Sequence, residues 1–449
     1  MIWIFEDYVM RIRFLAFCRL PLIACFLCGS VIANAATASS VWIGIRTDGK
    51  AGSGTASDPF NGSTQAKFDA LMSGFGANVN IYLLAGTYQT YGADSFLMKA
   101  GWKIYGAGIG ISTIQQTGFN PASHCHNILG NGWSANNIEV HNLTLDGNHA
   151  ALNATGANAD DSFSGAVIYG SNSVVQDVET INLYGDPTLG REEFSILLGG
   201  ANSNGMATNC QILDCVTHHY AAGATYTNGS GLGYCTNSLI SNCTDDGGNH
   251  GVGAAASQNI TIENNTTTMN TVDGFYTDTG TISTLIISHN WLAASQLPIQ
   301  FNNLGATNVE ILDNTLTTSN NSNPGNAAAI YLNVGNLTQF QITGNNVIYT
   351  GTGNYQFIAN GGHNSTLSIQ NNSGTASLGG VVLLAYATTD ILDYGNFVGT
   401  NYFNGQIATP APPPSSKHKT TTVALSTATG GASPSSPPPS LLVKQAHHG

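Results

Sequence analysis

The residues of this chain that are best suited to chemistry are carboxylates and histidines, which concentrate between residues 140 and 280. Hydrolysis of a glycosidic bond needs two carboxyl groups, one protonated and one ionised, and their mutual repulsion helps to raise one of the two pKa values. We expect Asp245 or Asp246 to act together with Asp273, and we expect His250 to orient Asp273 or to tune its pKa.

Arg191 supports a second chemistry, because residues 104–416 contain no other arginine or lysine. Elimination from an acidic sugar needs a base of high pKa opposite a neutralised carboxylate, and Arg191 could be that base or the cation that holds the sugar. Asp160, Asp161 or Asp214 could then bind Ca²⁺, which prefers oxygen ligands. Hydrolysis would require no cofactor. Arg191 could equally be a solvated loop charge.

Further side chains in this region are suited to holding a sugar. Aromatic faces stack on sugar rings, and polar groups hydrogen-bond their hydroxyls. The candidates for substrate binding are Glu193, His218, His219, Tyr220, Tyr276 and Asp278. An ordinary structural role is also open, since aspartate before glycine, as in Asp245-Asp246-Gly247, is common turn chemistry.

These side chains can meet only if distant segments of the chain lie side by side, and an internal repeat predicts that they do. An isoleucine followed three positions later by asparagine recurs five times, at intervals of 24 to 31 residues, with the asparagines at Asn265, Asn290, Asn314, Asn345 and Asn372. Period-two apolar alternations precede each copy, which indicates short strands joined by turns. The repeat therefore predicts a parallel β-helix in which the asparagines stack, bond the backbone and tolerate a left-handed turn.

Alignment of the repeats brings the chemical candidates together. His250 and Asp273 both precede a glycine at the start of a strand, one coil apart, so they should touch. The acidic pair that follows Ile240 falls beside His218 and His219. A groove across these coils would hold the candidates within about 15 Å, three rungs of the helix.

The first 35 residues have the pattern of a signal peptide, with a basic start, an apolar run and a small-residue cleavage site at Ala33-Asn34-Ala35. Leu22 to Cys25 resembles a lipoprotein box, but the apolar residues after Cys25 argue against it. No stretch of the mature chain is long and apolar enough to span a bilayer. We expect a secreted or surface-attached protein.

The rest of the chain divides into three parts. Residues 41–117 are expected to form an N-terminal cap and the first coils, with a short helix over 65–72 that covers the open end of the solenoid. Residues 118–404 should form the remaining coils as one domain. Residues 410–449 are rich in proline and serine and predict a disordered tail or linker.

Several segments resemble those of a known superfamily. The opening Asp48-Gly49 with Gly52 to Thr55, the strand Ile81 to Tyr88, and the strand Lys103 to Gly108 are followed by asparagine-laddered coils. Together they look like the pectate-lyase-like (pectin lyase fold) right-handed parallel β-helix superfamily. The resemblance implies an all-β, right-handed, single-stranded parallel β-helix with a groove along one face. Most enzymes of this group act on polysaccharides, but the scaffold also carries adhesins.

The resemblance to one branch of this superfamily is partial. Asp245-Asp246 and His250-Gly251 are similar to the Asp-Asp and Gly-His-Gly elements of polygalacturonases. Here the two elements are five residues apart rather than one coil apart, and the Asn-Thr-Asp and Arg-Ile-Lys elements are missing. Recognition of galacturonate is therefore in doubt.

The acidic balance excludes a nucleic-acid partner, since the formal net charge is −13. We expect an exported enzyme that degrades a polysaccharide, by glycoside hydrolysis, in a groove across the middle coils. The alternatives are a polysaccharide lyase that uses Arg191, with or without Ca²⁺, and a non-catalytic carbohydrate-binding or adhesive β-helix. The sequence leaves open the polysaccharide, the stereochemistry, the choice between monomer and trimer, and the oxidation state of Cys125, Cys210, Cys215, Cys235 and Cys243.

Overall fold

The structure is a computed structural model. The chain forms two compact units, residues 1–37 and residues 38–449, and every described residue belongs to the second unit. The predicted signal peptide and the predicted tail lie outside the described residues, so both stay predictions. The described residues are 39–133, 135–154, 162–185, 193–218, 220, 224, 227–302, 304–319, 328–332, 336–351, 355–360, 363–364, 367–376, 381–385, 401–403 and 406–408.

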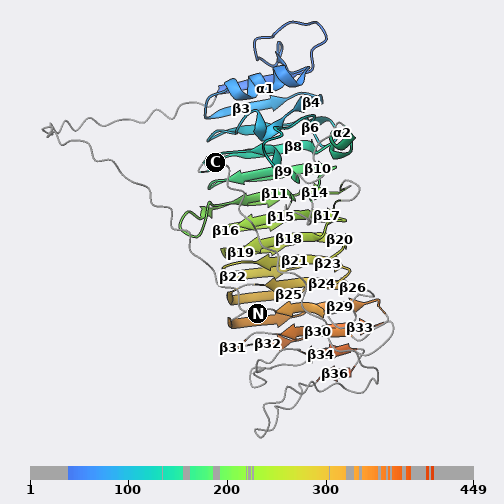
Figure 1. The fold of residues 1–449 in the computed structure, drawn as a ribbon. Coiled ribbons are helices and arrows are strands. Elements are labelled where there is room, and N and C mark those ends of the chain that lie inside the picture. Colours follow the sequence, from blue (N-terminus) through green and yellow to red (C-terminus); the bar gives the residue numbers. More distant parts are fainter. Residues whose placement is uncertain are drawn as a thin grey trace, which may run out of the picture. The chain divides into compact units, whose positions relative to one another are not determined.

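The second unit is a stack of parallel strands that form two sheets (Figure 1). In the ten-stranded sheet each strand pairs with its counterpart one coil later, so a strand's two neighbours belong to the previous and the next repeat. In order along the stack, its strands are β7 (Cys125–Gly130), β9 (Ser162–Tyr169), β11 (Glu193–Gly199), β15 (Thr227–Gly233), β18 (His250–Ala255), β21 (Asp273–Asp278), β24 (Leu297–Asn302), β27 (Ala328–Leu332), β30 (Tyr355–Asn360) and β34 (Val381–Ala385).

The larger sheet supplies the other sides of each coil, and the strand pairs within it are parallel except for the last two strands. The predicted right-handed parallel β-helix is confirmed. Its strands are β1 (Ser39–Gly44), β2 (Phe60–Asn61), β3 (Val79–Leu83), β4 (Gly86–Thr90), β5 (Lys103–Tyr105), β6 (Ser112–Gln116), β8 (Glu139–Asp146), β10 (Val174–Ile181), β12 (Ala207–Thr208), β13 (Gln211–Leu213), β14 (Val216–Thr217), β16 (Cys235–Ser241), β17 (Thr244–Asp246), β19 (Gln258–Glu263), β20 (Thr266–Asn270), β22 (Thr281–Ser288), β23 (Trp291–Ala294), β25 (Gly305–Leu312), β26 (Thr315–Thr318), β28 (Asn336–Thr343), β29 (Asn346–Tyr349), β31 (His363–Asn364), β32 (Leu367–Gln370), β33 (Ser373–Ala376), β35 (Asn401–Phe403) and β36 (Gln406–Ala408).

The core of the β-helix consists of columns of side chains, one residue from each coil. Val252, Phe275, Ile299 and Ile330 lie opposite one another on successive strands of the ten-stranded sheet, and all four are fully buried. Alternate residues of a strand point to opposite faces. The residues between them, such as Tyr276, therefore point away from the core.

The asparagine column is confirmed and forms a continuous hydrogen-bonded ladder. In each rung the backbone N–H and the side-chain Nδ2 of one asparagine both donate to Oδ1 of the next, for example from Asn290 to Asn314 at 3.0 and 2.9 Å. The left-handed turn is taken by the residue before each asparagine, such as Asp313 with φ 53°, and not by the asparagine itself. Cys243 stands at the head of the ladder, where its N–H donates to Asn265 Oδ1.

The first coils are covered by a helix, as the sequence predicts. α1 (Gln65–Gly74) lies beside the first strands of the stack (Figure 1). It begins after Thr64, whose hydroxyl accepts from Lys67 N–H, and it buries Phe68 and Met72. Two short helical segments, η1 (Gly92–Asp94) and α2 (His149–Ala154), complete the described elements. Among the described residues, no helix has the length and apolar character that crossing a bilayer requires.

Candidate functional site

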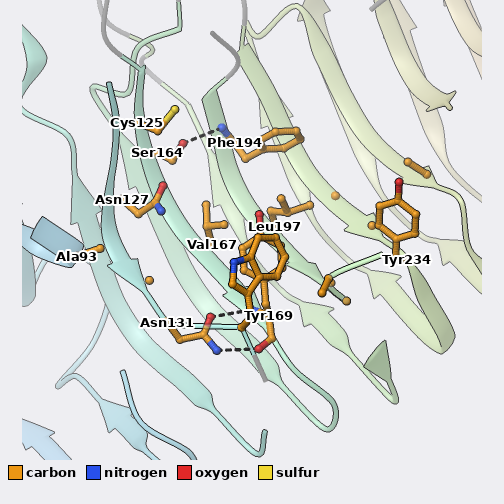
Figure 2. A pocket seen from close by; sticks show the side chains of 18 of the residues that line it. Ala93, Cys125, Asn127, Asn131, Ser164, Val167, Tyr169, Phe194, Leu197 and Tyr234 are labelled. Carbon is orange, nitrogen blue, oxygen red and sulfur yellow. Dashed lines mark hydrogen bonds between the residues drawn. The ribbon is translucent and has the colours of Figure 1, made fainter. Parts of the chain in front are cut away.

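A groove runs across the outer face of the ten-stranded sheet, from β7 to β21, with a volume of about 720 Å³. Its walls are mainly aromatic and apolar, and Figure 2 shows several of these side chains projecting from neighbouring strands and turns over one face. The large side chains that line it are Leu97, Trp133, Val167, Tyr169, Phe194, Leu197, Leu232, Tyr234 and Tyr276.

The floor of the groove is low because small residues occupy its outward positions. Gly231 lies opposite Gly253, and Gly233 lies opposite Ala255, so two neighbouring strands expose almost no side chain. Gly253 has a further role, because a Cβ there would lie 2.5 Å from the ring of Tyr276. The absence of that atom lets the Tyr276 ring lie over the neighbouring strand.

One wall of the groove is a pair of stacked aromatic rings, and the side-chain amide of Asn131 hydrogen-bonds the backbone of one of them. The rings of Trp133 and Tyr169 stack with centroids 4.2 Å apart, and Trp133 remains 47% exposed. Asn131 fixes the backbone of Tyr169, since its Nδ2 donates to Tyr169 O and its Oδ1 accepts from Tyr169 N, both at 2.7 Å (Figure 2). Burial raises the pKa of the Tyr169 hydroxyl to about 12, so this side chain is neutral at physiological pH.

Two carboxylates reach the groove, one near each end. Asp278 ends β21, and its Oδ1 accepts from Thr279 N–H at 2.6 Å. Its Oδ2 is buried and has no hydrogen-bond partner among the described residues, and burial raises its pKa to about 6. Asp94, beside β7, accepts from Asn120 N–H and pairs with His126 Nδ1 at 2.7 Å.

The two carboxylates are too far apart to act on one bond. β7 and β21 are separated by five spacings between neighbouring strands, roughly 24 Å. Paired carboxyls that hydrolyse a glycoside lie roughly 5 to 9.5 Å apart. The described lining therefore contains no such pair, and it contains no lysine or arginine.

Three of the predicted catalytic residues are buried and do not line the groove. Asp245, His250 and Asp273 are at most 2% exposed, and none of them lines the groove. Asp245 lies on β17, in the larger sheet.

His250 and Asp273 are buried beside the groove and not in the core. They lie in register with Asn228 and, through it, with Phe194, which lines the groove, and the centroid of the His250 ring lies 5.0 Å from that of the Tyr276 ring. Their predicted contact is confirmed, since His250 Nδ1 lies 2.9 Å from Asp273 Oδ2.

The buried acids form a hydrogen-bonded network in the middle coils. Tyr220 donates its hydroxyl to Asp245 Oδ2 at 2.7 Å, and Asn270 Nδ2 donates to Asp245 Oδ1 at 2.6 Å. Ser195 Oγ lies 3.2 Å from the Tyr220 hydroxyl and donates to Glu193 Oε1 at 3.3 Å. The network ties three coils together from within.

Burial determines the charge of this network. It raises the pKa of Asp245 to about 6 and, together with the nearby Asp245 charge, raises the pKa of Glu193 well above its usual value. Gly229 makes room for the network, since a Cβ there would lie 2.6 Å from Asp245 Oδ2. Glu193 is fully buried and does not line the groove, so its predicted place on a sugar-binding surface finds no support. Tyr220 is partly exposed and packs against the core, and its contact with a sugar stays a prediction.

No protein-family model matches the chain, and no curated protein matches it in sequence. Solved structures do share its architecture. The DFA-IIIase of Arthrobacter chlorophenolicus A6, solved without its lid, aligns with a TM-score of 0.51 at 11% identity, over 83% of this chain and 100% of that chain. The A-module of the mannuronan C-5 epimerase AlgE6 of Azotobacter vinelandii aligns with a TM-score of 0.43 at 17% identity, over 78% and 95%.

The chain has the pectate-lyase-like parallel β-helix fold. The surface adhesin PfbA of Streptococcus pneumoniae is a further similar structure, with a TM-score of 0.47 at 14% identity over 76% of this chain and 86% of that chain. At these identities the likeness concerns the fold alone, so the activity of this β-helix has to be argued from its own groove.

Two of the predicted substrate-binding residues, Tyr276 and Asp278, line the groove, and their contact with a substrate stays a prediction. Asp246 lies on β17 in the larger sheet, where it accepts from Thr268 Oγ1 at 2.9 Å, and His218 Nε2 lies 2.7 Å from Glu179 Oε1.

The predicted metal site finds no support in the described part of the chain. Asp214 accepts from the side-chain amides of Gln176 and Asn242. No group of three or more histidine, cysteine, aspartate or glutamate side chains among the described residues could hold a metal ion. The remaining predicted site residues, Asp160, Asp161, Arg191 and His219, lie outside the described residues.

The sequence analysis missed the residues that shape the groove, above all Trp133, Phe194 and Leu197. A signal for the groove was present in the repeat. Gly199 and Gly233 lie opposite one another, as do Gly231 and Gly253, so glycine recurs on consecutive coils at two outward positions. Such a run predicts a hollow in the outer face rather than a turn.

Proposed function

We propose that this protein binds a polysaccharide chain lengthwise in the groove. The observation that carries the proposal is the aromatic wall, in which Trp133 stacks on Tyr169 and stays about half exposed beside a floor of glycine. Sugar rings present apolar C–H faces that pack on such a surface, and a concave site with few polar groups is typical of ligand pockets. The groove is open across successive strands, which suits a polymer better than a single sugar.

The test is glycan binding by variants of the aromatic wall. Trp133→Ala should weaken binding by about 0.5–1.5 kcal/mol, about 2- to 13-fold in Kd, because one stacking surface is lost. Trp291→Ala is the matched control, since Trp291 is 55% exposed on β23 and does not line the groove. Affinity electrophoresis or calorimetry with a bound polysaccharide measures both. Equal losses in the two variants would refute the assignment of the groove.

A second candidate function, glycoside hydrolysis, is favoured by Asp278. Its carboxyl lines the groove, and with a pKa of about 6 a fraction of it is protonated near neutral pH, as a general acid requires. The catalytic roles of Asp245, Asp246, His250 and Asp273 stay a prediction, as does a lyase reaction at Arg191 with Ca²⁺. Among the described carboxyls that reach the groove, Asp278 is the one without a partner for Oδ2.

Product analysis separates hydrolysis from binding alone. A hydrolase releases new reducing ends, a lyase releases unsaturated products, and an adhesive β-helix releases neither. Asp278→Asn should abolish reducing-end formation while glycan binding stays detectable. Retained hydrolysis in Asp278→Asn would exclude Asp278 as the acid. We also propose that the protein is exported, on the basis of the predicted signal peptide over residues 1–35.

A further inference from the structure

We propose that the polysaccharide held in the groove is uncharged, and not a polyuronate. This inference rests on the proposed glycan binding and names the class of glycan. It is carried by the charges that line the groove. The described lining contains two carboxylates, Asp94 and Asp278, and no lysine, arginine or histidine.

The sequence shows that other cations near the groove are few. Arg191 is the one lysine or arginine within residues 104–416, the segment that contains every strand of the ten-stranded sheet. Two cations of the earlier coils are engaged elsewhere, since Lys103 pairs with Glu139 at 2.7 Å and Lys99 donates to backbone carbonyls near the end of α1.

A polyuronate would be poorly accommodated here. It carries a carboxylate on each sugar, and a groove of roughly 24 Å would face several of them. A carboxylate taken out of water needs a cation or several hydrogen-bond donors. Here it would meet an apolar wall and the carboxylates of Asp94 and Asp278, within a chain whose formal net charge is −13. Like charges in a partly desolvated groove repel one another.

An uncharged polysaccharide supplies the groups that the groove lacks. Asp278 Oδ2 is a buried acceptor with no partner among the described residues, so it needs a donor. A sugar hydroxyl is such a donor, and its hydrogen bond to an ionised carboxylate belongs to the stronger class. The sugar hydroxyl therefore gives Asp278 Oδ2 a hydrogen-bond donor. The apolar faces of the sugar rings pack on Trp133, Tyr169 and Tyr276.

The test compares polymers that differ in charge. Binding of the full chain is measured by affinity electrophoresis and calorimetry against uncharged polymers (β-glucan, mannan, unsubstituted xylan), polyuronates (polygalacturonate, alginate) and cationic chitosan. Each is tested at low and high salt, with CaCl₂ and with EDTA. We expect at least one uncharged polymer to bind, with a Kd that salt and EDTA leave unchanged, because screening acts on charge pairs.

The role of Asp278 is tested by Asp278→Asn. This variant keeps the Oδ1 acceptor for Thr279 N–H and replaces the unpartnered Oδ2 by an amide nitrogen, so affinity for the uncharged polymer should fall about 10-fold or more. Asp313→Asn is the matched control, because Asp313 is an exposed aspartate that does not line the groove.

The outcomes distinguish the two proposals. Binding of a polyuronate, with or without Ca²⁺, or salt-sensitive binding of chitosan overturns the inference and leaves glycan binding in place. If no polymer of any class binds, glycan binding itself fails and the inference falls with it. Unchanged affinity in Asp278→Asn would show that no sugar hydroxyl bonds Asp278 Oδ2, and the inference, which depends on that contact, would be overturned.

Discussion

The buried carboxyl of Asp245 should make the protein less stable as the pH rises, and Asp245→Asn should remove this effect. The folded-state pKa of Asp245 is about 6, whereas an unburied aspartate has a value of 3.8. An acid whose pKa is raised by folding binds its proton more tightly in the folded state. The unfolded chain therefore loses this proton first as the pH rises from 4, and stability decreases until the folded group also ionises near pH 6.

The size of this loss of stability follows from the shift in the pKa of Asp245. One pKa unit corresponds to 1.36 kcal/mol, so a shift of about 2 units lowers the free energy of unfolding by about 3 kcal/mol between pH 4 and pH 7. Asparagine has no proton to lose, and in Asp245→Asn its amide can still accept from Asn270 and bond the Tyr220 hydroxyl. The variant should therefore lack this part of the pH dependence.

The assay is urea unfolding of the wild type and Asp245→Asn, followed by circular dichroism at a series of pH values. Subtracting the two curves isolates Asp245, because carboxylates with depressed pKa values, such as Glu139 beside Lys103, contribute the opposite slope to both proteins. We expect the variant to gain stability relative to the wild type as the pH rises. Parallel curves from pH 4 to pH 8 would refute the argument that burial controls this carboxyl.

Three further predictions test the ladder, the groove and the thiols. Asn314→Ala should destabilise the fold by about 2–6 kcal/mol, because it leaves buried groups of the neighbouring asparagines without partners at about 1–3 kcal/mol each; chemical unfolding measures the loss. Gly253→Ala should displace the Tyr276 ring and weaken glycan binding while the circular dichroism spectrum stays unchanged. Cys125 should react with a thiol reagent in the folded protein, and the four buried cysteines only after unfolding.

Each of these predictions has a control or a contrary outcome. Asn346→Ala removes an exposed asparagine of β29 outside the ladder, at a position without a positive φ, and should cost less than 1 kcal/mol. Gly74→Ala adds a methyl group where no atom lies within 4 Å and should leave binding unchanged. Rapid reaction of all five described cysteines in the native protein would contradict their burial.

The β-helix could be predicted from the sequence because a short sequence pattern repeats once in each coil. Each Ile-x-x-Asn phrase places an aliphatic residue in the core and an asparagine in the ladder, and neighbouring coils repeat the same contacts. Each repeat buries its apolar face only against the repeats before and after it. The order of the repeats along the chain is therefore enough to predict which coils are in contact. The same alignment correctly placed His250 against Asp273, since that contact depends only on register.

The site could not be predicted in the same way, because it depends on which face of the sheet each residue occupies. Phe275 and Tyr276 are neighbours in one strand, yet Phe275 points into the core and Tyr276 into the groove. The sequence analysis placed catalytic residues where ionisable residues are concentrated. A buried carboxylate can instead have all its hydrogen-bond partners inside the protein, as Asp245 has Tyr220 and Asn270.

The sequence by itself determined the coil, its register and the near absence of cations over three hundred residues, since each of these follows from residue order and composition. Only the tertiary structure decided that the carboxyls of Glu193 and Asp245 are buried in an internal network and that an aromatic groove lies on the outer face of the ten-stranded sheet. The physical reason is that a strand alternates its side chains between two faces, so a shift of one residue exchanges core for surface.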